Sequence, residues 1–126
     1  MTIEEFIEAR IAEDEDIAAG AEQGPRRDWA EDYGREFLVV SRVEAGIPVC
    51  DVRSTAESQH IARHDPAREL RSAAAWRRVM EFGAALISAS QQIEFEDTVL
   101  LPIAAIWFGH PDYDRSWAAD GGGSAI

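Results

Sequence analysis

Residues 54–76, STAESQHIARHDPARELRSAAAW, carry two helix-start signals in succession. The first is Ser54 with Glu57 three residues later, a capping box in which polar side chains bond the free backbone groups of the first turn. The second is the pair Asp65-Pro66, because aspartate caps a helix and proline suits the first helical position, where no N–H is needed. We therefore expect two helices in this stretch, with a break between them at Asp65.

Further helices are expected at both ends of the chain. Thr2 and Glu5 form another capping box, and the apolar residues after them recur at helical spacing. Towards the C-terminus, Asp97 or Thr98 can begin a last helix, which Pro102 would kink or delay. The complete set of expected helices covers about residues 3–19, 54–64 and 66–92, followed by one from residue 97 or 98.

Two segments between the first two helices favour strands. Residues 36–43 and 47–52 are rich in valine and other β-formers, and Gly46 lies in the turn between them, so they predict one β-hairpin. Residues 20–35 are expected to form a polar connector. The expected fold class is α+β, mainly helical, with three or four helices and one β-hairpin.

Length and composition fit one intracellular domain. The chain has 126 residues, of which 46% are hydrophobic, enough to bury a core. We expect a single globular domain over residues 1–119 and a flexible C-terminal tail at residues 120–126. Cys50 is the one cysteine, which fits a reducing compartment. The chain starts with neither a signal peptide nor an apolar segment long enough to span a bilayer, so we expect a cytoplasmic protein.

Charge limits the classes of partner. The net charge is −12, which argues against general binding to nucleic acids or anionic membranes. Acidic residues dominate residues 1–25, whereas arginines dominate residues 53–78. These two segments can attract each other, in the same chain or between two copies. The acidic first helix could also imitate DNA phosphates, but a solvated face accounts for it more simply.

His60 and His64 are the first candidate site. They are four residues apart on one predicted helix, so their side chains share a face and can bind one metal ion. His110 could complete the set, and a divalent metal such as zinc is the cofactor that these residues would take. The spacer lacks the glutamate of the metalloprotease helix motif. The alternative is that both side chains make hydrogen bonds near a helix end.

The second candidate is an interaction surface on the predicted helix 66–92. Its arginines suit carboxylates or phosphates, because the guanidinium fork matches both. Pairing with the acidic first helix or with a partner protein fits the charge balance, whereas a phosphorylated ligand lacks support from a glycine-rich loop. The residues of this surface are Arg68, Arg71, Arg77 and Arg78.

Four sequence blocks carry a resemblance to a known family. They are HIARHDPAREL (60–70), WRRVM (76–80), FIEARIAEDEDIA (6–18) and HPDYDRSW (110–117). Together they resemble a family of short uncharacterised proteins, a domain of unknown function, from actinobacteria and their phages. The resemblance implies no activity. The chain departs from it at Arg26, where family members have a tryptophan after Gly-Pro.

These patterns favour a protein that works through contacts. We find no complete catalytic set and no cofactor-binding loop among the motifs, so the sequence leans away from an enzyme. We expect a small acidic accessory or regulatory protein that acts through a protein partner or self-association. The alternative is a metal-binding protein or metal-dependent hydrolase that uses His60, His64 and His110.

Overall fold

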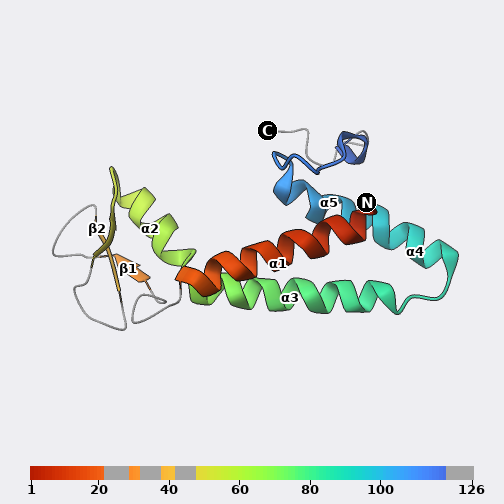
Figure 1. Ribbon diagram of the computed structural model, residues 1–126, viewed down its shortest axis with the longest axis horizontal. Coiled ribbons are helices and arrows are strands. Elements are labelled where there is room, and N and C mark those ends of the chain that lie inside the picture. The colour runs from red at the N-terminus through yellow and green to blue at the C-terminus, as the bar shows by residue number, and fades with distance from the viewer. Residues whose placement is uncertain (22–28, 32–37, 42–47, 119–126) are drawn as a thin grey trace. The chain divides into compact units, whose positions relative to one another are not determined.

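The computed structural model describes residues 1–21, 29–31, 38–41 and 48–118. The fold is α+β and mainly helical, as predicted (Figure 1). The helices are α1 (Ile3–Ala21), α2 (Thr55–Arg63), α3 (Pro66–Ala84), α4 (Ala89–Phe95) and α5 (Leu101–Ala104), and the strands are β1 (Trp29–Glu31), β2 (Leu38–Ser41) and β3 (Pro48–Asp51).

The predicted capping box at Thr2 forms in full, and at Ser54 the N-cap bond of the predicted box forms. The Thr2 N–H donates to Glu5 Oε2 at 2.8 Å, and the Glu5 N–H donates to Thr2 Oγ1 at 3.1 Å. The Glu57 N–H donates to Ser54 Oγ at 3.1 Å. Because these side chains bond backbone groups that a helix start leaves unpaired, α1 and α2 begin where the sequence predicts.

Asp65 performs the predicted capping role and a second one. Its Oδ1 accepts the Arg68 N–H at 2.9 Å, which caps α3. Its Oδ2 accepts the Trp29 N–H at 3.1 Å, so the same carboxylate also holds β1. Asp65 is only 8% exposed. One buried carboxylate thus joins the start of α3 to the first strand.

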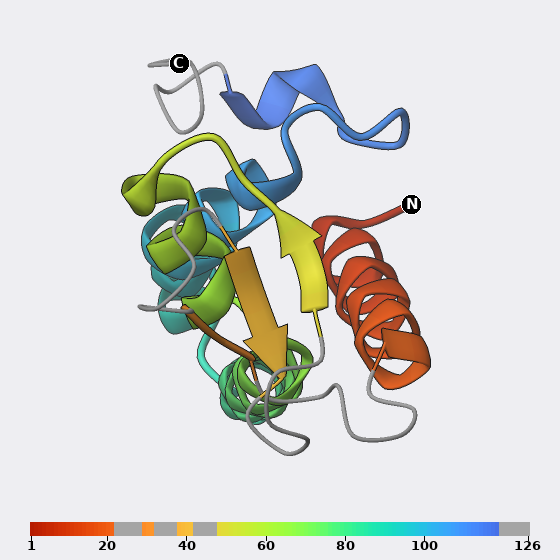
Figure 2. The same ribbon diagram turned by 90° about the vertical axis from the view of Figure 1, so that its left-hand side faces the viewer.

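The predicted hairpin is confirmed, but the sheet has a third strand. Antiparallel strands β2 and β3 pair Leu38 with Asp51, and β1 pairs with the other edge of β2 (Figure 2). The prediction that residues 20–35 form only a connector is therefore wrong at β1, a strand too short to show periodicity. The β2–β3 register shifts between Val39 and Val40, which marks a β-bulge. Pro48, the first residue of β3, can occupy this position because proline is accepted at the start of a strand or at a bulge.

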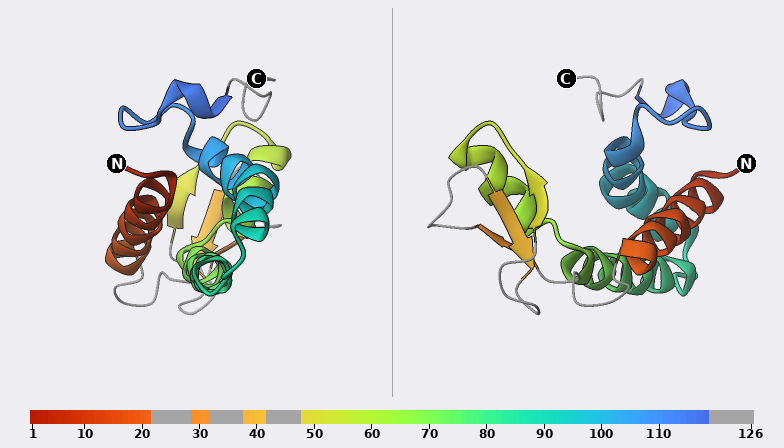
Figure 3. Two further views of the ribbon diagram at one scale, coloured as in Figure 1. Left: turned by 90° about the vertical axis from the view of Figure 1, so that its right-hand side faces the viewer. Right: turned by 60° about the vertical axis from the view of Figure 1, so that its left-hand side comes forward.

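The predicted helix 66–92 is two helices. α3 ends at Ala84, the chain turns, and α4 begins at Ala89 (Figure 3, right). The side-chain amide of Gln92 donates to the Leu86 carbonyl at 2.8 Å, which replaces a helical bond lost in the turn. The turn lets the Phe95 ring lie directly against Gly83. This contact joins two segments, so helical periodicity does not reveal it.

The last helical stretch starts earlier than the predicted residue 97 or 98. α4 continues through a π-helical turn, Glu96–Leu100, into α5. In that turn the Leu101 N–H donates to the Glu96 carbonyl, one residue further back than in an α-helix. Pro102 follows at once. Because proline has no N–H and its ring clashes with the carbonyl four residues back, the wider turn accommodates it without ending the helix.

The chain divides into two compact units, which are described separately: Met1–Ala12 with Ala75–Ile126, and Glu13–Ala74. Helices α1 and α3 each run from one unit into the other. The prediction of a single globular domain over residues 1–119 stays a prediction, and the tail at residues 120–126 lies outside the described residues. In the described part of the chain, no helix has the length and apolarity needed to cross a membrane.

An aromatic cluster forms the core of the first unit. The Phe6 side chain of α1 is fully buried. Four rings from the C-terminal part of the chain surround it, with centroids 5.2 to 6.5 Å away: Trp107, His110, Tyr113 and Trp117. Edge-to-face pairs of this kind add about 0.5–1.5 kcal/mol each to the burial of the rings. The cluster therefore holds the C-terminal turns against α1.

Because Asp65 makes two hydrogen bonds, we expect a large loss of stability when its side chain is truncated. Asp65→Ala should lower the free energy of unfolding by about 2 kcal/mol or more, because it removes a helix cap and the Trp29 bond together. Ser54→Ala removes only a cap and should cost about 1 kcal/mol. Urea denaturation measures both values. Equal losses in the two variants would show that the Asp65–Trp29 bond contributes nothing.

The Gly83–Phe95 contact predicts an unusual effect of alanine. Alanine stabilises most helix positions relative to glycine by up to about 1 kcal/mol. A Cβ at Gly83, however, would overlap the Phe95 ring, so Gly83→Ala should lower the melting temperature. Gly20→Ala is the matched control, because the space around Gly20 in α1 is open. That variant should melt at the same or a higher temperature, and a stabilised Gly83→Ala would contradict the contact.

Candidate functional site

His60 and His64 lie together on α2. Their ring centroids are 4.3 Å apart and both side chains are exposed. His64 Nδ1 lies 2.7 Å from the His60 carbonyl oxygen. A carbonyl can only accept, so His64 Nδ1 carries a proton, and in the neutral imidazole Nε2 then keeps the lone pair. This is the tautomer in which a histidine offers Nε2 to a metal ion.

A small recess lies beside His64 in the second unit. It has a volume of about 210 Å³, and its lining includes Trp29, Asp14 and Glu69. The carboxylates could serve as hard ligands, yet no three His, Cys, Asp or Glu side chains in the described ranges are grouped to hold a metal ion. The structure therefore brings together two of the three predicted metal ligands.

His110 belongs to the first unit and has a structural environment there. Its ring packs at 5.9 Å from Phe6, and its Nδ1 accepts the Asp112 N–H at 3.0 Å. The Tyr113 N–H donates to the His110 carbonyl at 3.0 Å. These contacts make His110 part of the closing turn and the aromatic core, and its role as a third ligand stays a prediction.

The four predicted interaction arginines are exposed on α3. Arg68 also stabilises the junction between α2 and α3, here called the helix joint, because its Nη1 donates to the Arg63 carbonyl at 3.1 Å. Arg78 lies at the edge of an apolar hollow. The remaining two, Arg71 and Arg77, are solvent-facing. Their exposure leaves them accessible to a partner, and their interaction role stays a prediction.

Two side chains that could act as nucleophiles are poorly suited to it. Burial raises the pKa of the Cys50 thiol, and the neighbouring Asp51 raises it further. The thiol is therefore protonated near neutral pH and reacts slowly. Burial likewise raises the pKa of Tyr113, whose hydroxyl has no hydrogen-bond partner among the described residues.

The first unit contains a hollow, here called the apolar recess, between α3 and the π turn with α5. Its volume is about 570 Å³, and its lining is apolar except for Arg78 and Thr98. Phe82 borders it and is 64% exposed, while Ile87 beyond it is 94% exposed. Apolar side chains at the end of α3 and just after it are therefore in part exposed at the surface.

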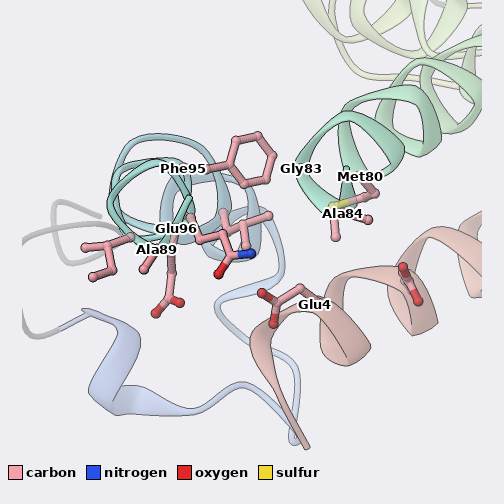
Figure 4. A pocket seen from close by; sticks show the side chains of 11 residues that line it. Glu4, Met80, Gly83, Ala84, Ala89, Phe95 and Glu96 are labelled. Carbon is pink, nitrogen blue, oxygen red and sulfur yellow. The ribbon is translucent and has the colours of Figure 1, made fainter. Parts of the chain in front are cut away.

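A second hollow, here called the acidic groove, also has Phe95 in its lining (Figure 4). Its volume is about 500 Å³, and α1, α3 and the stretch from α4 through the π turn all contribute to it. Its carboxylates are Glu4, Glu8 and Glu96. The sequence shows Glu4 and Glu8 on the acidic face of α1, whereas Glu96 joins the same lining only because the chain turns after α3.

Comparison with known proteins agrees with the resemblance at the level of the family. Neither a curated protein nor a solved structure matches the chain significantly. The model of one family covers the aromatic cluster, the helix joint and both hollows, and its match extends over residues 1–119. The chain therefore belongs to the family of unknown function DUF6221.

Proposed function

We propose that the protein is a small acidic accessory or regulatory protein of the cytoplasm, which acts through protein contacts. The observation that carries this proposal is the apolar recess with the exposed Phe82 beside it. Contiguous apolar surface of this kind is typical of protein interaction sites. Arginine is the only basic residue type in the chain, which together with the family resemblance supports an origin in actinobacteria or their phages.

Burial of the recess can supply the energy of association. A fully buried phenylalanine or valine side chain contributes about 1.5–3 kcal/mol, and Phe82, Val79 and Val99 all border the hollow. Aromatic anchors at the centre of an interface contribute more than their neighbours. The exposed arginines Arg77 and Arg78 on α3 add positive charges nearby, which would select the orientation of a partner.

Replacing Phe82 should abolish or weaken the binding of a partner protein. In quantitative pulldowns from an actinobacterial lysate, Phe82→Ser should reduce the recovery of specific partners about tenfold or more. Ile87→Ser is the control, because Ile87 is exposed but does not line the recess. Light scattering of the purified chain distinguishes a partner from self-association. A mass of 13.9 kDa, together with identical recovery by wild type and Phe82→Ser, would contradict the proposal.

A metal-binding protein is the second candidate, because the His64 Nδ1 bond to the His60 carbonyl leaves Nε2 as a ligand. A divalent ion such as zinc would be held by His60 and His64, with His110 proposed as the third ligand. Two or three histidine ligands leave coordination positions for water. A metal-dependent hydrolase would use that water, since the metal makes it acidic enough to act as a nucleophile near neutral pH.

Histidine variants test this candidate. In native mass spectrometry with one equivalent of Zn²⁺, the wild type should retain an ion, which His60→Ala and His64→Ala lose. Gln59→Ala, a neighbouring exposed position on α2, should retain it. Loss of the zinc ion in His110→Ala supports a site with three histidine ligands. A wild-type chain that retains no zinc contradicts the metal-binding function.

A further inference from the structure

The acidic groove combines one sign of charge with an apolar floor. Glu4 and Glu8 lie one turn apart on α1, and Glu96 comes from the π turn. All three side chains are exposed, and Figure 4 shows Glu4 and Glu96 reaching the groove from different helices. None of the described residues that line the groove is basic. The groove therefore presents three carboxylates without an internal counter-charge in its lining.

The floor is made of small and apolar side chains. Met80 and Leu100 are buried beneath it, and Gly83, Ala84 and Ala89 line it with almost no side-chain volume. Ile93 is 64% exposed and offers an apolar contact at the surface. The space exists because α3 and α4 approach at the Gly83–Phe95 contact, while the small residues beside that contact do not fill the hollow. A ligand that fits must therefore carry apolar as well as cationic groups.

Three kinds of occupant can be compared. A metal ion is disfavoured, because the described residues contain no group of acidic side chains close enough to hold one. A second copy is disfavoured by net charge, since two chains of charge −12 repel each other. A basic partner is attracted by the same charge. An amphipathic helix presents apolar and cationic side chains along adjacent rows, which matches a groove of about 500 Å³ with a charged rim.

We propose that the acidic groove binds a basic amphipathic helix of a partner protein, whose apolar side chains meet the floor and whose arginine or lysine side chains pair with Glu4, Glu8 and Glu96. This inference rests on the proposed function, that the protein acts through protein contacts. Charge-assisted hydrogen bonds from guanidinium to carboxylate orient the helix. Dissolved salt screens the exposed ion pairs, because the Debye length at physiological ionic strength is only about 8 Å. Salt does not screen the apolar contacts, which therefore still contribute affinity.

The experiment uses three labelled synthetic peptides of about 18 residues, enough for five helical turns. The first is an amphipathic helix of leucine and arginine, the second has the same composition in scrambled order, and the third replaces arginine by glutamate. Fluorescence anisotropy with the full chain should show binding of the first, about tenfold weaker binding of the scrambled peptide, and none of the acidic one. Equal binding of the first two would overturn the proposal, as would no binding of the first.

Matched charge variants separate the groove from the general acidity of the chain. Glu4→Gln/Glu8→Gln/Glu96→Gln should weaken binding of the first peptide about tenfold or more. The control, Glu81→Gln/Glu94→Gln/Asp97→Asn, removes three exposed carboxylates from α3, α4 and the π turn, outside the groove lining. It should change binding less than about twofold, since none of the three carboxylates lines the groove and exposed charges outside it contribute little in salt. Equal effects would assign the binding to overall charge and overturn the proposal.

The Phe82→Ser pulldown distinguishes this proposal from the proposed function. If Phe82→Ser removes the partners while the groove variant retains them and the peptide does not bind, the groove proposal fails and the proposed function stands. If Phe82→Ser changes nothing and the chain is monomeric without partners, the proposed function fails. Loss of partners in the groove variant but not in its control supports the groove as the site.

Discussion

Burial of Phe6 is the contact on which the first unit depends. Its ring lies among four rings from residues 107–117, so a single side chain of α1 organises the end of the chain. The same helix carries Glu4 and Glu8 on an exposed face. Because the buried face holds α1 in place, the exposed face can form one wall of the acidic groove. The core of this unit thus positions its candidate binding surface.

Phe95 and Gly83 connect the two hollows of that unit. Phe95 lines both the apolar recess and the acidic groove, and it can approach α3 only because position 83 has no side chain. The recess offers apolar surface beside an arginine, whereas the groove offers carboxylates around an apolar floor. A partner that covers both hollows would meet an arginine in one and carboxylates in the other. Such a pattern would favour one orientation of a bound chain, because reversal would place like charges together.

The candidate sites differ in how far the sequence could predict them. His60 and His64 are four residues apart on one helix, so their proximity follows from helix geometry alone. His110 takes its place in the aromatic cluster through contacts with Phe6, more than 100 residues earlier in the chain, which spacing cannot reveal. Glu96 likewise lines the same groove as Glu4 only after the chain has turned. Residues that meet across a fold carry no shared periodic signal.

The sequence by itself determined the local elements: the helix caps at Thr2, Ser54 and Asp65, the hairpin and the mainly helical α+β class. Each depends on residues within a few positions of one another, where backbone geometry dictates which groups can meet. Tertiary structure alone decided the third strand, the end of α3 at Ala84, the π turn before Pro102 and both hollows. These depend on bonds and packing between distant segments, such as Trp29 with Asp65 across 36 positions, because long-range contacts override local helix propensity.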